Sequence, residues 1–162
     1  MLKNRHPIRE KEARDVADAL SNVFGSPARW EGRLVEAGDD EGFRIFFVDG
    51  VPMAFASEGR VMPTVKGLLA YPATERFVTV DEGAVSFILR GADVMAPGVV
   101  DADPKVAVGD AVWVREVKHL RPLAVGIAVM SGPEMAAAEK GRAVKTVHHL
   151  RDKLWDLTQE AP

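Results

Sequence analysis

Few residues in this chain of 162 residues have the types and spacing that metal or acid–base chemistry needs. His148 and His149 are adjacent, and because neighbouring residues of a strand face opposite sides, they are poorly placed to share one metal ion. His6 and His119 are isolated, and no His-x-x-x-His spacing occurs. The acidic run Asp39–Glu41 lacks the alternating ligand spacing of a calcium loop, so we expect a solvated turn there. The sequence therefore predicts no metal site.

Motifs for covalent or phosphoryl-transfer catalysis are also missing from the sequence. The chain has no cysteine, which excludes disulfides, thiolate zinc ligands and a cysteine nucleophile. Neither a Gly-x-Ser-x-Gly elbow nor a Gly-x-x-x-x-Gly-Lys-Ser/Thr phosphate loop occurs. No segment combines a nucleophile, a base and oxyanion donors. We therefore expect a protein that is not an enzyme and needs no cofactor.

The positive charge of the chain is concentrated near its carboxyl end. The net charge is −3, yet residues 115–153 contain eight Lys or Arg against four Asp or Glu. A local basic face can attract phosphate even on an acidic molecule. These cations are Arg115, Lys118, Arg121, Lys140, Arg142, Lys145, Arg151 and Lys153.

The first 75 residues predict a helix followed by antiparallel strands. Pro7 suits the first turn of a helix, and Gly25 is expected to end that helix. Between them, apolar residues at steps of three and four form one stripe, namely Ala13, Val16, Ala17, Leu20, Val23 and Phe24. Strands are expected over residues 30–37, 43–48 and 51–56, and a short helix over 63–69. Asp49–Gly50 is a strong hairpin signal, so this half predicts a small α+β layer that buries one sheet face.

The second half predicts short strands with regular turns, which favours a closed or nearly closed barrel. After a strand from Arg76, Asp81 is placed to cap a helix that Gly91 ends. Later strands are expected over residues 112–115, 123–130 and 143–149, with short helices over 134–140 and 152–157.

Three large side chains of the second half have more than one interpretation. Trp113 shares a strand face with Arg115, so it could stack on a base or pack against a neighbouring layer. Trp155 is expected to hold the last helix onto the barrel, and Met95 is expected to fill the core.

Several motifs of the second half, taken together, resemble the PUA domain, a small RNA-binding fold. They are Val80-Asp81-Glu82-Gly83-Ala84, Gly91-Ala92-Asp93-Val94-Met95-Ala96-Pro97-Gly98-Val99, Val108-Gly109-Asp110, Ala124-Val125-Gly126-Ile127-Ala128 and Gly141-Arg142-Ala143-Val144. The resemblance implies a PUA pseudo-barrel of short β-strands with two or three short helices.

The first half and the ending extend this resemblance to archaeal PUA proteins that carry a pre-PUA domain. These are relatives of the eukaryotic translation-reinitiation factor called multiple copies in T-cell lymphoma. Met62-Pro63-Thr64-Val65-Lys66 and the ending from Thr146 to Trp155 are similar to that group. His149 stands where the group usually has Tyr, and Arg151 stands where it usually has Gly or Asn. An Arg at positive φ carries a steric cost that Gly does not.

The resemblance implies an α+β protein with two domains, a pre-PUA domain over residues 1–74 and a PUA domain over residues 75–158. By position in the PUA domain it implicates Arg90, Gly91, Ala92, Met95, Pro97 and Gly98 in RNA binding. The glycines would let the RNA backbone approach, and exposed main-chain amides would donate to phosphate. Charge alone adds Arg115, Lys145, His148 and Arg151.

The function that the resemblance implies is non-catalytic binding of tRNA or ribosomal RNA in translation initiation, reinitiation or ribosome recycling. One alternative is a protein-interaction adaptor whose translation-factor partner supplies RNA specificity, and another is an accessory subunit in RNA modification. The start of the chain lacks the apolar run of a signal peptide, and no stretch approaches the roughly 18 apolar residues of a membrane span. We therefore expect a soluble cytoplasmic protein without a membrane partner.

Overall fold

The structure, a computed structural model, describes residues 1–157. The chain divides into two compact units. The first unit contains Met1–Ala73 together with the segment that begins at Lys153, and the second contains Thr74–Asp152. The predicted PUA domain of residues 75–158 extends beyond the second unit, and its last residue lies outside the described residues.

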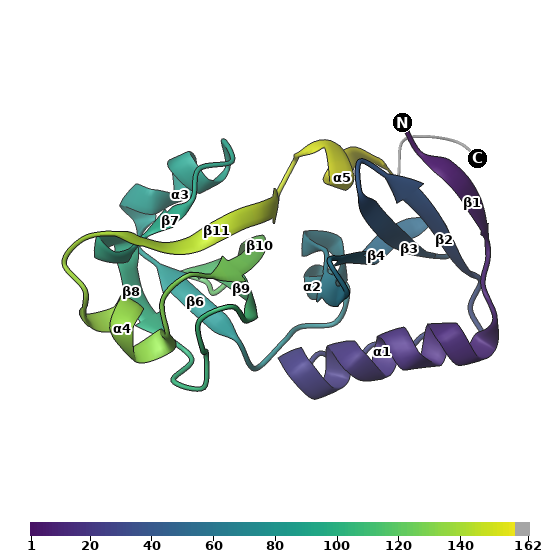
Figure 1. The fold of residues 1–162 in the computed structure, drawn as a ribbon, viewed down its shortest axis with the longest axis horizontal. Helices are drawn as coiled ribbons and strands as arrows, with labels where there is room; N and C mark the ends of the chain where they lie inside the picture. The colour runs from purple at the N-terminus through teal and green to yellow at the C-terminus, as the bar shows by residue number, and fades with distance from the viewer. Residues whose placement is uncertain (158–162) are drawn as a thin grey trace. The chain divides into compact units, whose positions relative to one another are not determined.

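The first unit is a five-stranded antiparallel sheet with helices packed on it (Figure 1). The strand order is β1-β2-β3-β4-β5, so consecutive strands are neighbours throughout. The elements are β1 (Lys3–Pro7), α1 (Glu10–Phe24), β2 (Val35–Asp40), β3 (Phe43–Val48), β4 (Val51–Ser57), β5 (Arg60–Pro63), α2 (Val65–Ala70) and α5 (Lys153–Asp156).

Helix α1 buries the predicted apolar stripe. Ala13, Val16, Ala17, Leu20 and Phe24 are buried, whereas Val23 remains 40% exposed. Gly25 ends the helix in the left-handed region, with φ of 63°, and its amide donates to carbonyls of the last turn. The helical prediction for this segment is therefore confirmed except at its start.

The start of α1 differs from the prediction because a strand precedes it. Pro7 is the last residue of β1, opposite Glu36 of β2, and the helix begins only at Glu10. Strand β1 is an edge strand, where the missing amide of proline is tolerated. Local propensity could not reveal this strand, because its partner β2 lies about 30 residues further along the chain.

The acidic run is only partly a turn, in contrast to the solvated turn that was predicted. Asp39 and Asp40 belong to β2, and the turn itself is Glu41–Gly42, both at positive φ. Asp40 is 6% exposed and faces the Lys153 ammonium at 3.8 Å. The strand predicted for residues 30–37 therefore lies later, at residues 35–40.

The predicted hairpin at Asp49–Gly50 is confirmed. Both residues have positive φ, 51° and 84°, as a two-residue turn between antiparallel strands requires. It joins β3 to β4, which pair through Val48 and Val51.

Trp155 packs within the first unit, so the expectation that it holds the last helix onto the barrel is wrong. The Lys66 ammonium of α2 donates to the Trp155 carbonyl at 2.8 Å and lies 4.5 Å from the indole centroid. Leu154 and Leu157 are also buried. The apolar pattern predicted this helix but could not identify the surface that covers it.

The second unit contains a six-stranded, nearly closed barrel, and the predicted fold class is confirmed (Figure 1). Its strand order is β7-β11-β10-β9-β6-β8, in which only β6 and β9 run parallel. The edge strands β7 and β8 do not pair with each other, and one short 3₁₀ helix connects them in the chain. The elements are β6 (Phe77–Val80), α3 (Glu82–Ile88), β7 (Val94–Met95), η1 (Ala96–Gly98), β8 (Val99–Ala102), β9 (Ala111–Glu116), β10 (Pro122–Ala128), α4 (Gly132–Ala137) and β11 (Arg142–His149).

Alternating apolar residues fill the barrel. Val112 and Val114 of β9 are fully buried in the core that β6, β10 and β11 also line. Gly126 allows β10 to approach β11, because a Cβ there would lie 2.2 Å from the Lys145 carbonyl oxygen. Asp81 caps α3 as predicted, since its carboxylate accepts from the Ala84 amide at 3.0 Å. Among residues 1–157, no helix has the length and apolar character needed to cross a membrane.

Candidate nucleic-acid interface

The turn between α3 and β7 contains three of the predicted contact residues. Arg90, Gly91 and Ala92 are all exposed, and Gly91 has φ of 92°, a conformation that favours glycine. The amides of these three residues donate to the carbonyls of Phe87 and Ile88 over 2.9–3.1 Å. The expectation that they are available to phosphate is therefore wrong, because they already close the helix end.

Asp93 fastens this turn to β11. Its carboxylate accepts from the Thr146 amide at 2.9 Å and from the Arg142 guanidinium at 3.1 Å. The Thr146 hydroxyl in turn donates to the Ala92 carbonyl at 2.9 Å. These bonds join segments about 50 residues apart in the sequence, and they bring the predicted turn beside the predicted basic strand.

Three cations in these segments have no partner in the described part of the chain. Arg90 lies in the turn, Lys145 lies on β11, and Arg151 follows the end of β11; all three side chains are exposed. By contrast, Arg142 is neutralised by Asp93. Arg90–Ala92, Lys145 and Arg151 are here called the turn–β11 surface. Unpaired cations beside exposed main chain are suited to the phosphates of a nucleic acid.

Arg151 is held at the turn–β11 surface by a buried histidine. His148 is fully buried, and its Nδ1 lies 2.9 Å from both carboxylate oxygens of Asp152. Asp152 also accepts from the His149 amide at 2.9 Å, which closes the turn around Arg151. Arg151 has φ of 69°, so this position does carry the predicted backbone cost. His148 positions the turn and does not itself reach the surface, which corrects its prediction as a contact residue.

The predicted contact residues at the end of β7 and in η1 differ in their exposure and contacts. Met95 is 51% exposed, so the expectation that it fills the core is wrong. Pro97 is exposed in η1. The Gly98 carbonyl accepts from the Asp81 amide at 2.9 Å, and a Cβ at Gly98 would lie 3.2 Å from the Cβ of Ala84. Gly98 therefore lets the start of α3 pack closely against η1.

Arg115 lies on β9, away from these segments in the strand order, and is held within its own cluster. Its Nε donates to the Thr79 hydroxyl at 2.9 Å, and its guanidinium lies 3.9 Å from the Phe77 ring centroid. Burial lowers the pKa of the Arg115 guanidinium, opposed by the charge of Asp101. Trp113 is 4% exposed, and its indole donates to the Glu75 carbonyl at 2.8 Å. Packing is therefore the correct interpretation of Trp113, which offers no face to a base.

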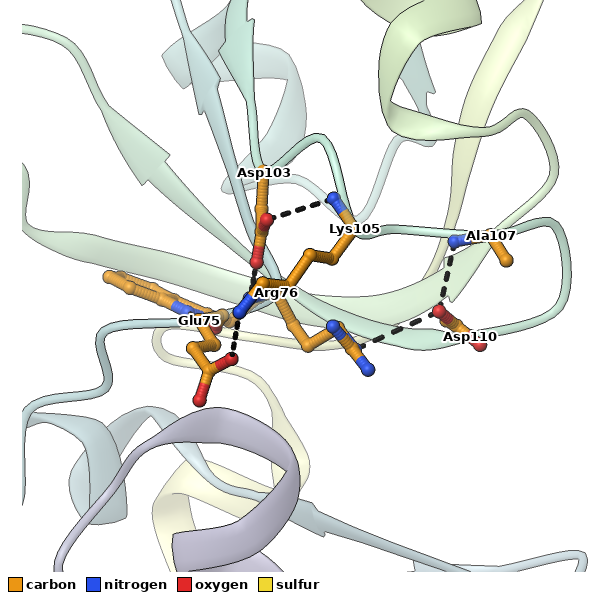
Figure 2. A network of polar contacts seen from close by, with 7 residues as sticks. Glu75, Arg76, Asp103, Lys105, Ala107 and Asp110 are labelled. Carbon is orange, nitrogen blue, oxygen red and sulfur yellow. Dashed lines mark hydrogen bonds and ion pairs between the residues drawn. The ribbon is translucent and has the colours of Figure 1, made fainter.

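A second charged cluster lies where the chain enters the barrel (Figure 2). Figure 2 shows Asp103 between two main-chain amides, from Arg76 at 2.6 Å and from Lys105 at 3.0 Å. The side chains of Arg76 and Lys105 face Asp110 at 3.7 Å and Glu75 at 3.1 Å, respectively. Both cations face carboxylates of the same cluster, so their charge is neutralised there and the cluster holds the strand ends in place. The turn–β11 surface therefore remains the candidate site for phosphate binding.

His149 was missed as a candidate although it lies at the turn–β11 surface. A Cβ placed on Gly91 would lie 3.3 Å from His149 Nε2. The available signal was the difference from the Tyr that the resemblance predicts at this position. Asp93 and Thr146 were also missed, because only the folded barrel brings them together. Within residues 1–157, no group of three or more His, Asp or Glu side chains is arranged to hold a metal ion.

Comparison with protein families identifies both halves of the chain. The family model of the PUA domain matches residues 76–150, and the model of a domain of unknown function, DUF1947, matches residues 4–71.

Curated relatives match nearly the whole chain. An uncharacterized protein of Methanocaldococcus jannaschii is 45% identical over 96% of this chain and 98% of its own length. Malignant T-cell-amplified sequence 1-A of Xenopus laevis is 31% identical over 88% of this chain and 84% of its own length. Translation machinery-associated protein 20 of Saccharomyces cerevisiae is 29% identical over 93% of this chain and 84% of its own length.

Solved structures share the same fold. A hypothetical protein of Pyrococcus horikoshii aligns with a TM-score of 0.82 and 39% identity, covering 96% of this chain and 99% of that one. A conserved PUA domain protein of Thermoplasma acidophilum aligns with a TM-score of 0.81 and 32% identity, covering 93% of this chain and 97% of that one.

Proposed function

Because this chain belongs to the family of PUA-domain proteins that carry an N-terminal DUF1947 region, we propose that it is a non-catalytic RNA-binding protein of the translation machinery. Its relatives named for the translation machinery support the setting. The RNA is tRNA or ribosomal RNA, bound in the cytoplasm during initiation, reinitiation or ribosome recycling. The observation that carries the proposal is the turn–β11 surface, where three exposed cations lack a partner among residues 1–157.

The geometry favours recognition of the RNA backbone over recognition of bases. Arginine and lysine side chains supply the contacts, since the amides of the turn are already bonded within α3. Trp113 is buried and so offers no stacking platform. If Arg90, Lys145 and Arg151 each neutralise one phosphate, log Kd should change with log salt at a slope of about 2 to 3 in magnitude.

Charge reversal at the turn–β11 surface tests the proposal. Arg90→Glu, Lys145→Glu and Arg151→Glu should each weaken binding of bulk tRNA or of a ribosomal RNA fragment by about tenfold, because each removes a phosphate contact and adds repulsion. Fluorescence anisotropy at several salt concentrations would give both the affinity and the slope.

Lys118→Glu is the matched control, because Lys118 is also exposed but lies in the β9–β10 connection. It makes the same change of net charge and should reduce affinity much less. Equal losses in all four variants would indicate unspecific attraction and reject the turn–β11 surface. Unchanged affinity in the three test variants would reject it as well.

A protein-interaction adaptor is the second candidate, favoured by two exposed apolar side chains. Phe87 on α3 is 59% exposed and Met95 on β7 is 51% exposed. Large apolar side chains that remain exposed are candidates for contact with another protein. Phe87→Asp should then abolish retention of a protein partner from RNase-treated lysate while tRNA affinity stays within about twofold. Retention by the variant would remove this candidate.

A further inference from the structure

His149 is the last residue of β11, and its ring lies beside Gly91 of the turn–β11 surface. Its side chain is partly exposed, in contrast to the fully buried ring of its neighbour His148. Its Nε2 faces Gly91, whose exposed main chain has φ of 92°. We propose that His149 is an RNA-contacting residue that binds a backbone phosphate through Nε2 when the ring is protonated. This inference rests on the proposed function.

A hydrogen bond of the His149 ring determines which ring nitrogen carries the proton. His149 Nδ1 lies 3.0 Å from the Leu150 carbonyl oxygen. A carbonyl can only accept, so Nδ1 carries the proton and donates. In the neutral ring Nε2 is then an acceptor, which repels a phosphate oxygen. Protonation turns Nε2 into a charged donor, which is the form that a phosphate binds.

Gly91 provides the space for this contact. A Cβ at this position would lie 3.3 Å from His149 Nε2 and 3.6 Å from Cδ2, so a side chain would crowd the ring. Gly91 is also the point at which the backbone turns out of α3 toward β7. The glycine therefore leaves the edge of the imidazole beside an open stretch of main chain, and the ring edge can meet an RNA backbone that approaches there.

The elements beside His149 carry both basic and acidic side chains. In the α3–β7 turn these groups are Arg90 and Asp93, and after β11 they are Arg151 and Asp152. Both carboxylates are bonded to other groups of the protein. On β11 itself the groups are Arg142, which is paired with Asp93, together with Lys145 and His148, and the neighbouring strand β10 has no titratable side chain. An RNA phosphate that reaches this surface would supply the anionic partner of the protonated ring.

The test is the pH dependence of RNA affinity, because histidine is the side chain that ordinarily changes charge between about pH 5 and 8. The parent protein should bind tRNA about two- to fivefold more tightly at about pH 5.5 than at about pH 8, as expected for one exposed charge pair. The salt slope should also be steeper by about 0.7–0.9 at the lower pH, since one more phosphate is neutralised.

His149→Tyr should abolish both differences, because tyrosine keeps a ring but cannot gain a positive charge in this range. His119→Tyr is the matched control, since His119 is exposed in the β9–β10 connection, and it should retain both differences. Persistence of the pH dependence in His149→Tyr would overturn the inference. A parent that binds tRNA with equal affinity at both pH values would overturn it too.

A measurement on the parent protein covers the case in which a variant fails to fold. In nitrogen-15 NMR of the imidazole groups, added tRNA at about pH 6 should shift His149 Nε2 and leave the buried His148 ring unchanged. An unmoved Nε2 signal during saturable binding would reject the contact. Absence of tRNA binding at every pH would instead reject the proposed function, and this inference with it.

Discussion

At the scale of single residues, the turn after β11 combines a buried histidine that fixes the backbone with an exposed arginine that we propose to contact RNA. His148 is buried and fixes Asp152, and Asp152 closes the turn that presents Arg151. Arg151 then occupies the left-handed region at a steric cost that a glycine would avoid. A strained, exposed cation at this point is consistent with a contribution to binding that offsets its cost to stability.

Arg151→Gly should therefore stabilise the protein while it weakens RNA binding. We expect the free energy of unfolding to rise by about 0.5–1 kcal/mol, because glycine adopts positive φ without a Cβ clash. Denaturant unfolding and tRNA anisotropy would measure the two effects. Arg151→Ala is the control, which loses the same charge but keeps the clash. Equal stability of the glycine and alanine variants would show that the backbone is not strained here.

At the scale of elements, the hairpin turn between β9 and β10 depends on one buried carboxylate. Glu116 is 7% exposed and accepts from the His119 amide and from Nε of Arg121. Burial raises the pKa of the Glu116 carboxyl, but the hydrogen bonds and the charge of Arg121 outweigh burial and bring the pKa to about 2. The turn is thereby held although it exposes Val117 and places Leu120 at φ of 57°.

Glu116→Gln should remove an acid-sensitive part of the stability. A carboxyl with a lowered pKa stabilises the fold fully above its ordinary pKa of 4.5, and this contribution disappears as pH falls through about 2. The variant should therefore be less stable than the parent at pH 7, and the difference should shrink toward pH 2. Urea unfolding across this range would measure it, and a constant difference would contradict the assignment to this carboxyl.

At the scale of the whole molecule, the end of the chain returns to the first unit. Helix α5 follows the barrel in the sequence, yet Trp155 and Leu154 pack with the unit that contains α2. Burial lowers the pKa of Lys66, opposed by the charge of Asp156, and the Lys66 ammonium caps the Trp155 carbonyl. The first unit is therefore built from both ends of the chain, with the barrel inserted between them.

Trp155→Ala should destabilise the first unit and leave the barrel intact. Loss of this partly exposed aromatic side chain and its cation contact should cost about 1–2 kcal/mol of local stability, because it removes buried apolar area and the aromatic partner of Lys66. Hydrogen exchange should accelerate at the amides of β3 and β4 and stay unchanged at those of β9 and β10. Faster exchange in β9 and β10 as well would contradict the division into separate units.

The sequence predicted those features that depend on neighbouring residues. The stripe of α1, the Asp49–Gly50 turn, the Asp81 cap and the short strands of the second half all follow from local spacing and backbone preference. Strand β1 was missed, since it exists only through pairing with β2. Asp40 was assigned to a solvated turn for the same reason, because only its tertiary surroundings bury it.

For the candidate interface, the sequence by itself determined which residues carry positive charge and where glycine permits a turn. Only the tertiary structure decided that Arg90 and Lys145 have no partner within residues 1–157. It also decided that His148 is buried and that Arg115 is held by Thr79 and aromatic rings. The physical reason is that charge and backbone preference are properties of a residue and its neighbours. Burial, ion pairing and the meeting of distant segments depend on long-range contacts, which exist only once the barrel has closed.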